Sequence, residues 1–315
     1  MKGIVIAGNI LLDKLNEISV YPNCGQLTKI KSVDKAVGGC VPNVAIDIKR
    51  LDSTVDVYAS GKVGKDGDAK YVLDVLNNNG VDTNSVVYGD EATSFTDVMS
   101  ILGGERTFFT YAGASANYGF DDVEEKLFGA EMFHLGYFLL LDKVDSGDGV
   151  KILKKAKEMG AKTSIDLVSE NSDRYSIVLP ALQYTDNIII NEIEASKLSG
   201  VEDDIKKMAI KLKELGVKER VIIHCPNFAV CMSNDGYTVV NSLDLPKGFI
   251  KGATGAGDAF CAGSLYGIYK GYTDKEILEF ASKVAVCNLS APDSISGVKS
   301  VKETEEFCSQ FKRKV

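Results

Sequence analysis

Residues 1–8 read Met-Lys-Gly-Ile-Val-Ile-Ala-Gly, and the prediction of the fold starts from them. The run Ile4 to Ala7 is short, apolar and flanked by glycines, which is typical of a buried strand. The apolar residues that follow are interrupted at Asn9 and end at Asp13 without a small-residue cleavage site, so we do not expect a signal peptide. We interpret the segment as the first strand of a sheet.

Short β-branched runs alternate with helical patterns along the rest of the chain. The runs similar to the first are Val55 to Ser60, Met132 to Leu135, Thr163 to Leu167, Asn187 to Ile190 and Arg220 to His224. Helical stripes lie between them, an apolar one at Ala69, Val72, Leu73 and Leu76 and a weaker one at Val150, Leu153, Ala156 and Lys157. This alternation predicts an α/β fold, with a doubly wound, mainly parallel sheet and helices on both faces. Ligands then bind at the carboxyl ends of the strands.

Two segments interrupt this alternation and predict a small antiparallel sheet that projects from the main body. They are about residues 15–37 and 93–112, and no crossover helix follows either one promptly. Within the second, Phe95 to Leu102 and Arg106 to Tyr111 predict a hairpin that turns at Gly103-Gly104. We expect this sheet to form a lid over the strand ends, with a plain surface hairpin as the alternative. Residues 1–315 are expected to form one domain into which the lid is inserted.

Composition and charge exclude several kinds of partner. The 315 residues are 45% apolar and 25% charged, which is ordinary for a globular protein. Lys and Arg total 36 against 44 Asp and Glu, a net charge of −8 without basic clusters, so neither nucleic acid nor a membrane surface is expected as a partner. The apolar run Met132 to Leu141 is too short to span a bilayer.

Other classes are excluded by motifs that are missing from the sequence. The seven cysteines are odd in number and contain no Cys-x-x-Cys pair, which favours reduced thiols and a cytoplasmic location. With only two histidines as well, a zinc site is not expected. The first strand is not followed by Gly-x-Gly-x-x-Gly, and no P-loop pattern is present, so we expect neither a nicotinamide-dependent dehydrogenase nor a P-loop enzyme.

The segment Gly252-Ala253-Thr254-Gly255-Ala256-Gly257-Asp258 precedes a helical stretch and carries the strongest chemical signal. Small residues at a helix start let backbone N–H groups face an anion or a developing negative charge. A carboxylate there would repel a phosphate unless it serves to take a proton from an attacking hydroxyl. The combination favours phosphoryl transfer to an alcohol, with Asp258 as the general base. The alternative is a glycine-rich turn in which Asp258 only caps the helix.

A pair of glycines, Gly38 and Gly39, stands before another predicted helix that begins near Pro42 and Asn43. Two glycines permit close approach of the backbone to a ligand, and the Asn43 amide can both donate and accept hydrogen bonds, as polyols require. The alternative is a tight turn followed by an ordinary helix start. Taken alone, this motif favours the alternative.

Asn191 and Glu194 directly follow the predicted strand Asn187 to Ile190. Residues at this spacing lie one helical turn apart on the same face. The pair could hold hydrated magnesium beside nucleotide phosphates. Solvated surface groups are the commoner meaning of such a pair.

Together the three motifs resemble those of the ribokinase-like (PfkB) family of carbohydrate kinases. The family's first signature is matched at Gly38, Gly39, Asn43 and Ala45, and its second at Thr254 to Asp258. The two lie about 210 residues apart in the family's order, which is far more specific than either alone. The family's Asn-x-x-Glu motif falls at Asn191 and Glu194, and the resemblance extends from Ile4 to the helix after Asp258.

The resemblance implies ATP-dependent phosphorylation of a hydroxyl, expected to be a primary one, of a sugar or sugar-like substrate. It implies that Asp258 is the general base and that the amides of Gly255, Ala256 and Gly257 stabilise charge on the transferring phosphoryl group. Substrate binding is implied for Asp13, Gly38, Gly39 and Asn43. Binding of ATP and Mg²⁺ is implied for Thr254, Asn191 and Glu194, with Glu194 holding the metal through water. The lid would exclude water, and a homodimer through the projecting sheet is plausible.

Several positions depart from the family's patterns. Gly252 replaces an Asp that often helps to bind potassium, which leaves activation by K⁺ open. His224-Cys225-Pro226 replaces a Thr-x-Gly turn, and the role of His224 is not assigned. The segment Asp166 to Glu170 lacks the sugar-kinase pattern Asp-x-Asn-x-Arg, and Cys40 replaces the Lys of ribokinase. The identity of the sugar is therefore not predicted, and a nucleoside kinase or a non-catalytic sugar-binding homologue is the alternative.

Overall fold

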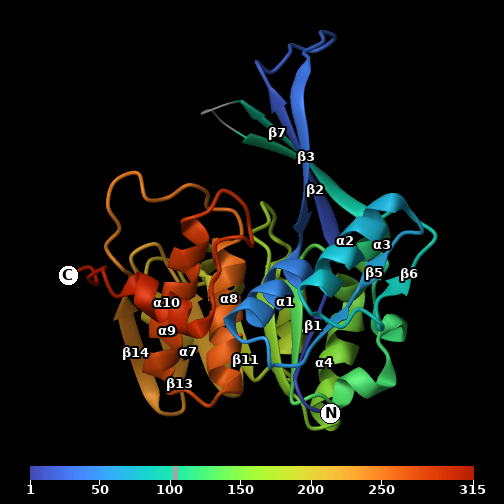
Figure 1. Cartoon of the computed structure of the whole chain (residues 1–315). Coiled ribbons are helices and arrows are strands. Elements are labelled where there is room, and N and C mark those ends of the chain that lie inside the picture. Colours follow the sequence, from blue (N-terminus) through green and yellow to red (C-terminus); the bar gives the residue numbers. More distant parts are fainter. Residues whose placement is uncertain (102–105) are drawn as a thin grey trace.

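An eight-stranded sheet forms the centre of the main body (Figure 1). The structure is a computed structural model that describes residues 1–101 and 106–315. The strands lie in the order β14-β13-β12-β11-β10-β9-β1-β4, and all neighbours from β12 to β4 are parallel. Their bounds are β1 Ile4–Ala7, β4 Val57–Ser60, β9 Met132–Phe138, β10 Lys162–Leu167, β11 Asn187–Asn191, β12 Arg220–His224, β13 Phe228–Ser233 and β14 Gly236–Asn241.

The predicted fold class is confirmed, because every strand expected for the parallel sheet is present in it. The first and last of these, Ile4 to Ala7 and Arg220 to His224, have the predicted bounds. The antiparallel hairpin of β13 and β14 at one edge was not predicted. It extends the sheet beyond β12.

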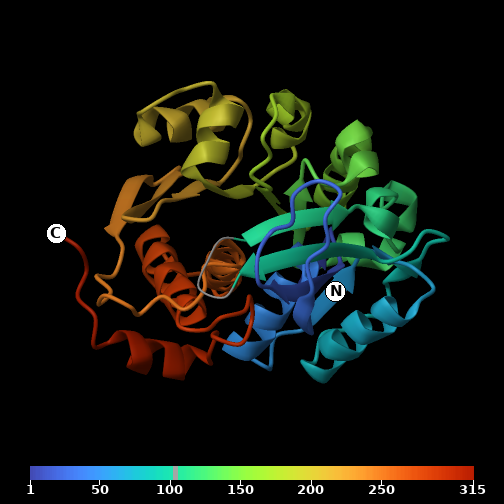
Figure 2. The same cartoon turned by 90° about the horizontal axis from the view of Figure 1, so that it is seen from above.

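Helices cover both faces of this sheet, which Figure 2 shows from above. One face is covered by α1 (Cys40–Leu51), α2 (Gly67–Asn78), α8 (Ala256–Tyr269) and α9 (Asp274–Leu289), with α10 (Val301–Cys308) packed outside α9. The other is covered by α4 (Gly149–Glu158), α5 (Leu179–Leu182), α6 (Glu192–Ser199) and α7 (Ile205–Glu214). Strand side chains point alternately to the two faces, so Ile189 joins the first core while Ile188 and Ile190 join the second.

A smaller four-stranded sheet stands away from the main body (Figure 1). Its order is β3-β2-β7-β8, with bounds β2 Leu11–Ile18, β3 Ile30–Gly38, β7 Ser94–Ile101 and β8 Arg106–Tyr111. β2 with β3 and β7 with β8 are antiparallel, as expected, whereas β2 and β7 pair in parallel. The turn predicted at Gly103-Gly104 lies outside the described residues.

The small sheet begins earlier in the sequence than the predicted boundary near residue 15. Leu11 pairs with Gly38 and Leu12 with Val37, so pairing with β3 continues down to the main body. Asp13 therefore lies on a strand of the small sheet, and not in a loop after β1. Leu11 and Leu12, directly before Asp13, are both buried. Buried apolar residues occur in the main core and at the base of the small sheet alike, so the sequence pattern does not show where the small sheet begins.

Shorter elements complete the fold. They are the strand pair β5 (Lys62–Val63) and β6 (Val87–Tyr88), the helix α3 (Gly113–Ala116) and short helical turns at Phe120–Asp122, Glu125–Gly129, Val144–Asp148 and Arg174–Val178. Within residues 1–101 and 106–315, no helix combines the length and apolarity needed to cross a bilayer.

Helices α8 and α9 pack closely at Gly263. A Cβ atom at this position would lie 2.8 Å from the Cα of Ala281 in α9, closer than real carbon contacts allow. The absence of a side chain therefore lets α8, which carries Asp258, approach α9 closely.

Replacing Gly263 by Ala is expected to lower the free energy of unfolding by about 1–3 kcal/mol relative to a Gly67→Ala control, because overpacking forces the two helices apart. Gly67 lies at the start of α2, where a Cβ would meet no atom within 4 Å, so this position tolerates the added methyl group. Urea denaturation followed by circular dichroism measures both variants. Equal midpoints for the two would contradict the tight packing at Gly263.

Candidate active site

Asp258 lies in the first turn of α8, where its carboxylate is buried and held by two donors. The Nδ2 of Asn43, in α1, donates to Oδ2 of Asp258 at 2.8 Å. The hydroxyl of Tyr137 donates to both oxygens, at 3.0 and 3.1 Å. The hydroxyl of Ser294 donates to Oδ1 of Asn43 at 3.0 Å, which turns the NH₂ group of that amide toward Asp258.

The loop before α8 needs glycine at position 255. Gly255 caps the helix with a φ of 79°, and a Cβ there would lie 2.6 Å from the Cβ of Ser294. The amides of the first helical turn have no acceptor within the helix and favour an anion beside them. The amide of Ala256 is partly engaged, because it donates to the carbonyl of Ala253 at 3.3 Å.

Two carboxylic acids of the site have raised pKa values. Burial, followed by the charge of Asp166, raises the pKa of Asp258 to about 6, although the hydrogen bonds from Asn43 and Tyr137 lower it. Burial, followed by the charge of Asp258, raises the pKa of Asp13 to about 7. Both acids therefore exchange protons close to neutral pH, which is common at functional sites.

The glycines of the first motif lie against polar side chains. A Cβ at Gly38 would come within 2.5 Å of a carboxylate oxygen of Asp13. Gly39 caps α1 with a φ of 89°, and a Cβ there would lie 2.2 Å from Oδ1 of Asn9. Neither position has room for a side chain, so the two glycines bring the backbone next to Asp13 at the start of α1.

Asn191 and Glu194 form a capping box at the start of α6. The Asn191 side chain accepts from the amide of Glu194 at 2.9 Å, and Oε2 of Glu194 accepts from the amide of Asn191 at 3.0 Å. The Ser169 hydroxyl donates to Oε1 of Glu194 at 2.8 Å. Glu194 is only 4% exposed, and burial raises its pKa to about 7. It is therefore not the solvated surface group that this spacing usually indicates.

Two cavities meet at this end of the sheet. The smaller, of about 210 Å³, is lined by polar groups that include Asp258, Glu194, Asn191, Tyr137 and Asp166. The larger, of about 620 Å³, has mainly apolar walls that include Phe260, Leu243, Leu245, Ile250 and Val286. Asn191, His224 and Gly257 line both cavities. The site is thus divided into an acidic chamber and an apolar chamber, with the start of α8 between them.

His224 forms part of the wall between the two chambers. Its ring packs on that of Phe260, with centroids 4.9 Å apart, and burial lowers the pKa of His224 to about 4. The imidazole is therefore neutral at neutral pH and serves as an aromatic wall.

Thr254 differs in position from the other residues singled out in the sequence. It is exposed and lines neither chamber, and its hydroxyl accepts from Nη1 of Arg106 at 3.3 Å. Arg106 lies at the start of β8, so this contact joins the small sheet to the loop before α8.

Sequence reasoning did not find Tyr137, Ser294 or Arg106. Tyr137 has a φ of 59°, which is rare for a residue with a side chain, and this turns its phenol toward Asp258. A strand pattern gives no sign of such a conformation. Ser294 lies in a loop after α9 and Arg106 beside the predicted hairpin turn, and neither belongs to a motif.

Comparison with known proteins gives the family and the fold. Residues 6–300 match the pfkB family carbohydrate kinase. The 5-dehydro-2-deoxygluconokinase of Clostridium botulinum (strain Alaska E43 / Type E3) is 24% identical over 303 residues, covering 91% of this chain and 88% of the relative. The structure of Arabidopsis thaliana ribokinase complexed with ribose and ATP has a TM-score of 0.84 at 22% identity, covering 97% and 98% of the two chains. A putative ribokinase II from E. coli in complex with ATP and Mg²⁺ has a TM-score of 0.81 at 21% identity, covering 98% and 100%.

The chain belongs to the pfkB family of carbohydrate kinases. It has the ribokinase-like fold, and it is a sugar kinase, an enzyme that transfers a phosphate to a hydroxyl group.

Replacing Tyr137 by Phe is expected to raise the pKa of Asp258 above about 6, because the variant loses a donor that stabilises the carboxylate. Titration of the ¹³C-labelled aspartate carboxyl carbons by NMR measures the shift. The control is Tyr111→Phe, since Tyr111 is exposed on β8. An unchanged or lower pKa in the Tyr137 variant would show that the phenol does not stabilise the ionised form.

Proposed function

We propose that the protein phosphorylates a primary hydroxyl of a sugar or sugar-like substrate, with ATP as the phosphate donor and Asp258 as the general base. The observation that carries the proposal is the place of the Asp258 carboxylate. It is buried, held by Asn43 and Tyr137, and lies at the first amides of α8 where the acidic and the apolar chambers meet.

Asp258 has the properties that a general base requires. A general base whose pKa lies near the working pH is ionised in much of the enzyme and still has a high affinity for the proton. With its pKa raised to about 6, Asp258 is mostly ionised at neutral pH and is a stronger base than an ordinary aspartate. The substrate hydroxyl gives its proton to this carboxylate while its oxygen attacks the terminal phosphate, and the bond from that phosphorus to ADP, the leaving group, breaks. The amides of Gly255, Ala256 and Gly257 stabilise the negative charge that the phosphoryl group carries during transfer.

The apolar chamber is proposed to hold the base of the nucleotide. Its volume of about 620 Å³ and its mainly apolar walls suit a planar aromatic ring. It borders Gly257, so a nucleotide bound there would present its phosphates to the start of α8. The ribokinase of Arabidopsis thaliana, which has the same fold, is complexed with ATP.

Glu194 and Asn191 are proposed to hold Mg²⁺, with Glu194 acting through water. The fit rests on the buried carboxylate of Glu194, which lines the acidic chamber and makes no ion pair with Lys or Arg within residues 1–101 and 106–315. Oxygen ligands of this kind suit a hard, hydrated cation. When bound, Mg²⁺ would neutralise charge on the nucleotide phosphates.

Substrate binding is proposed for Asp13, Asn43 and the backbone of Gly38 and Gly39. The carboxylate of Asp13 can accept hydrogen bonds from neighbouring hydroxyls, and the small sheet that carries it would close over the sugar. Arg106 contacts the loop of Thr254 from the same sheet, which supports a position of the small sheet over the phosphates. A closed sheet would exclude water and so limit hydrolysis of ATP.

Release of ADP in a panel of hexoses, pentoses, sugar acids and nucleosides tests the substrate class. The proposal expects turnover with a sugar or sugar acid in the presence of Mg²⁺. Turnover with nucleosides alone would favour the nucleoside-kinase alternative. The panel is run with and without K⁺, because Gly252 replaces the Asp that often helps to bind potassium in the family. A Cβ at Gly252 would lie 2.7 Å from the carbonyl oxygen of Pro292, so this position cannot hold a carboxylate without rearrangement.

Replacing Asp258 by Asn is expected to lower kcat by about a hundredfold to ten-thousandfold, because the amide cannot accept the proton. Replacing Asp13 by Asn is the matched comparison, and it is expected to act mainly by raising KM for the sugar. Steady-state kinetics with the substrate found in the panel separates the two effects. A kcat for the Asp258 variant close to that of the wild type would contradict its role as the base.

The pH profile of kcat/KM is expected to fall on the acid side through an apparent pKa between about 6 and 7. The pKa values of Asp258 and Asp13 are raised, to about 6 and about 7, so protonation of this pair begins near neutrality and removes the base as pH falls. Initial rates measured at low substrate concentration from acidic to alkaline buffer give the profile. A rate that stays constant down to about pH 5 would contradict the assignment.

A further inference from the structure

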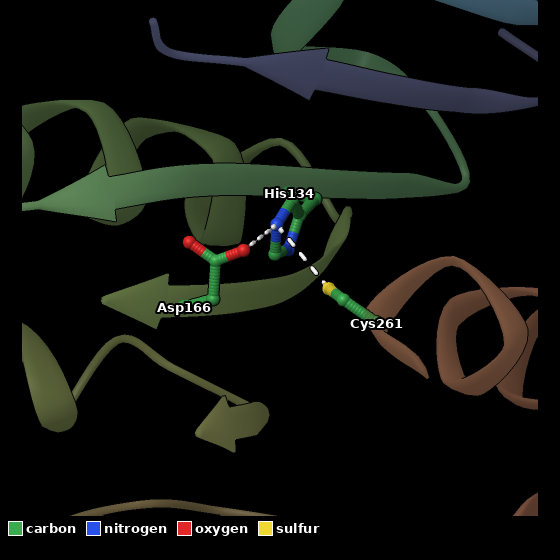
Figure 3. A group of neighbouring side chains, drawn as sticks. All are labelled: His134, Asp166 and Cys261. Atoms are coloured by element: carbon green, nitrogen blue, oxygen red, sulfur yellow. Dashed lines mark hydrogen bonds and ion pairs between the residues drawn. The ribbon is translucent and has the colours of Figure 1, made fainter. Parts of the chain in front are cut away.

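A second cluster of possible metal ligands lies in the wall of the acidic chamber. It consists of His134 on β9, Asp166 on β10 and Cys261 on α8, and Figure 3 shows the three side chains pointing toward one another. All three are buried, and their ligand atoms lie within 4.8 Å of one another. The three residues are far apart in the sequence, and the cluster includes none of the groups proposed to bind Mg²⁺.

Two of the three distances within the cluster agree with ligands around one tetrahedral ion, and the third pair, Asp166 and Cys261, has ligand atoms within 4.8 Å. Nε2 of His134 lies 3.3 Å from Oδ2 of Asp166 and 3.7 Å from Sγ of Cys261. Zinc bonds of roughly 2.0–2.3 Å at tetrahedral angles place nitrogen and oxygen ligands roughly 3.4 Å apart and nitrogen and sulfur ligands roughly 3.6 Å apart. Small side-chain adjustments would therefore be enough to bring the three atoms onto one cation.

Hydrogen bonding to Nε2 cannot satisfy both of its neighbours. The nitrogen carries either a proton or a lone pair, so it can donate to Asp166 or accept from Cys261, but it cannot do both. A cation placed between the three atoms would contact all of them at once. The thiol of Cys261 also donates to Asp166, so the three groups are already joined by hydrogen bonds, which a cation at their centre would replace with bonds to all three.

The outer contacts of the cluster engage the ligand-group atoms that point away from its centre. The other ring nitrogen of His134, Nδ1, lies 2.9 Å from the hydroxyl of Ser164. The other carboxylate oxygen of Asp166, Oδ1, accepts from the amide of Tyr137 at 2.6 Å. Such partners orient ligating histidines and carboxylates in metal sites.

An ion could reach this cluster from the acidic chamber. Asp166 and Cys261 both line that cavity of about 210 Å³, together with Asp258. The cavity also offers space for water as a further ligand, which would complete a tetrahedral set of three protein groups and one exchangeable group.

The chemistry of the ligands selects the kind of cation. Thiolate and imidazole groups favour zinc and similar transition metals, whereas magnesium prefers oxygen ligands. We propose that His134, Asp166 and Cys261 form a binding site for one thiophilic divalent cation such as Zn²⁺, separate from the Mg²⁺ site proposed at Glu194. The site places a positive charge in the wall of the chamber that contains Asp258.

Titration of the untagged, metal-free chain with Co²⁺ tests this proposal, because cobalt reports its ligands by absorption. We expect one equivalent to give the visible bands of tetrahedral cobalt and a sulfur-to-cobalt charge-transfer band in the near ultraviolet. Zn²⁺ should abolish both, and excess Mg²⁺ should leave them unchanged. Absence of the sulfur band at one equivalent of Co²⁺ would overturn the proposal.

Two variants and a control assign the ligands. Cys261→Ser should lose the sulfur band, while Cys225→Ser, which removes a thiol next to His224 outside the cluster, should keep it. Asp166→Asn preserves the side-chain volume and should weaken Co²⁺ binding at least about tenfold, with circular dichroism checking that it folds. A sulfur band retained in the Cys261 variant, or unchanged affinity in the Asp166 variant, would contradict the site. These readouts do not use kinase activity, so their failure leaves the proposed function unaffected.

Discussion

The hydrogen bond between Asn43 and Asp258 joins the two halves of the site. The residues are separated by 215 positions in the sequence, and each lies at the start of a helix on the same face of the central sheet. Ser294 holds the Asn43 amide so that its NH₂ group meets the carboxylate. Because the helix starts are held together in this way, the groups proposed to bind the substrate near α1 and the phosphates near α8 meet at one carboxylate.

Three acids of the site lie in a largely buried environment without a Lys or Arg partner in the part of the chain that the structure describes. Within residues 1–101 and 106–315, Asp13, Glu194 and Asp258 make no ion pair with Lys or Arg, and burial is the largest cause of the raised pKa of each. Burying charge without a partner disfavours the folded state, so such an arrangement is explained by function more readily than by stability. Cations that arrive with the nucleotide would supply the missing positive charge.

The parallel sheet and the signature motifs could be predicted from the sequence, because both depend on local patterns of residues. Buried parallel strands such as Ile4 to Ala7 are continuous apolar runs, and glycines at helix starts are visible directly. The β13–β14 hairpin was missed although its two-residue loop, Asn234-Asp235, consists of typical turn residues. Tyr137 and the cluster around His134 could not be predicted, since the first depends on an unusual φ angle and the second on contacts between distant segments.

In the proposed reaction, Asp258 receives the proton of the attacking hydroxyl at the start of α8. A crystal structure of the wild-type enzyme with its sugar and a non-hydrolysable ATP analogue tests it most directly. We expect the acceptor hydroxyl within hydrogen-bond distance, about 2.6–3.2 Å, of the Asp258 carboxylate and facing the terminal phosphate. A sugar bound with its acceptor hydroxyl against another group, and with Asp258 still bonded only to Asn43 and Tyr137, would contradict it.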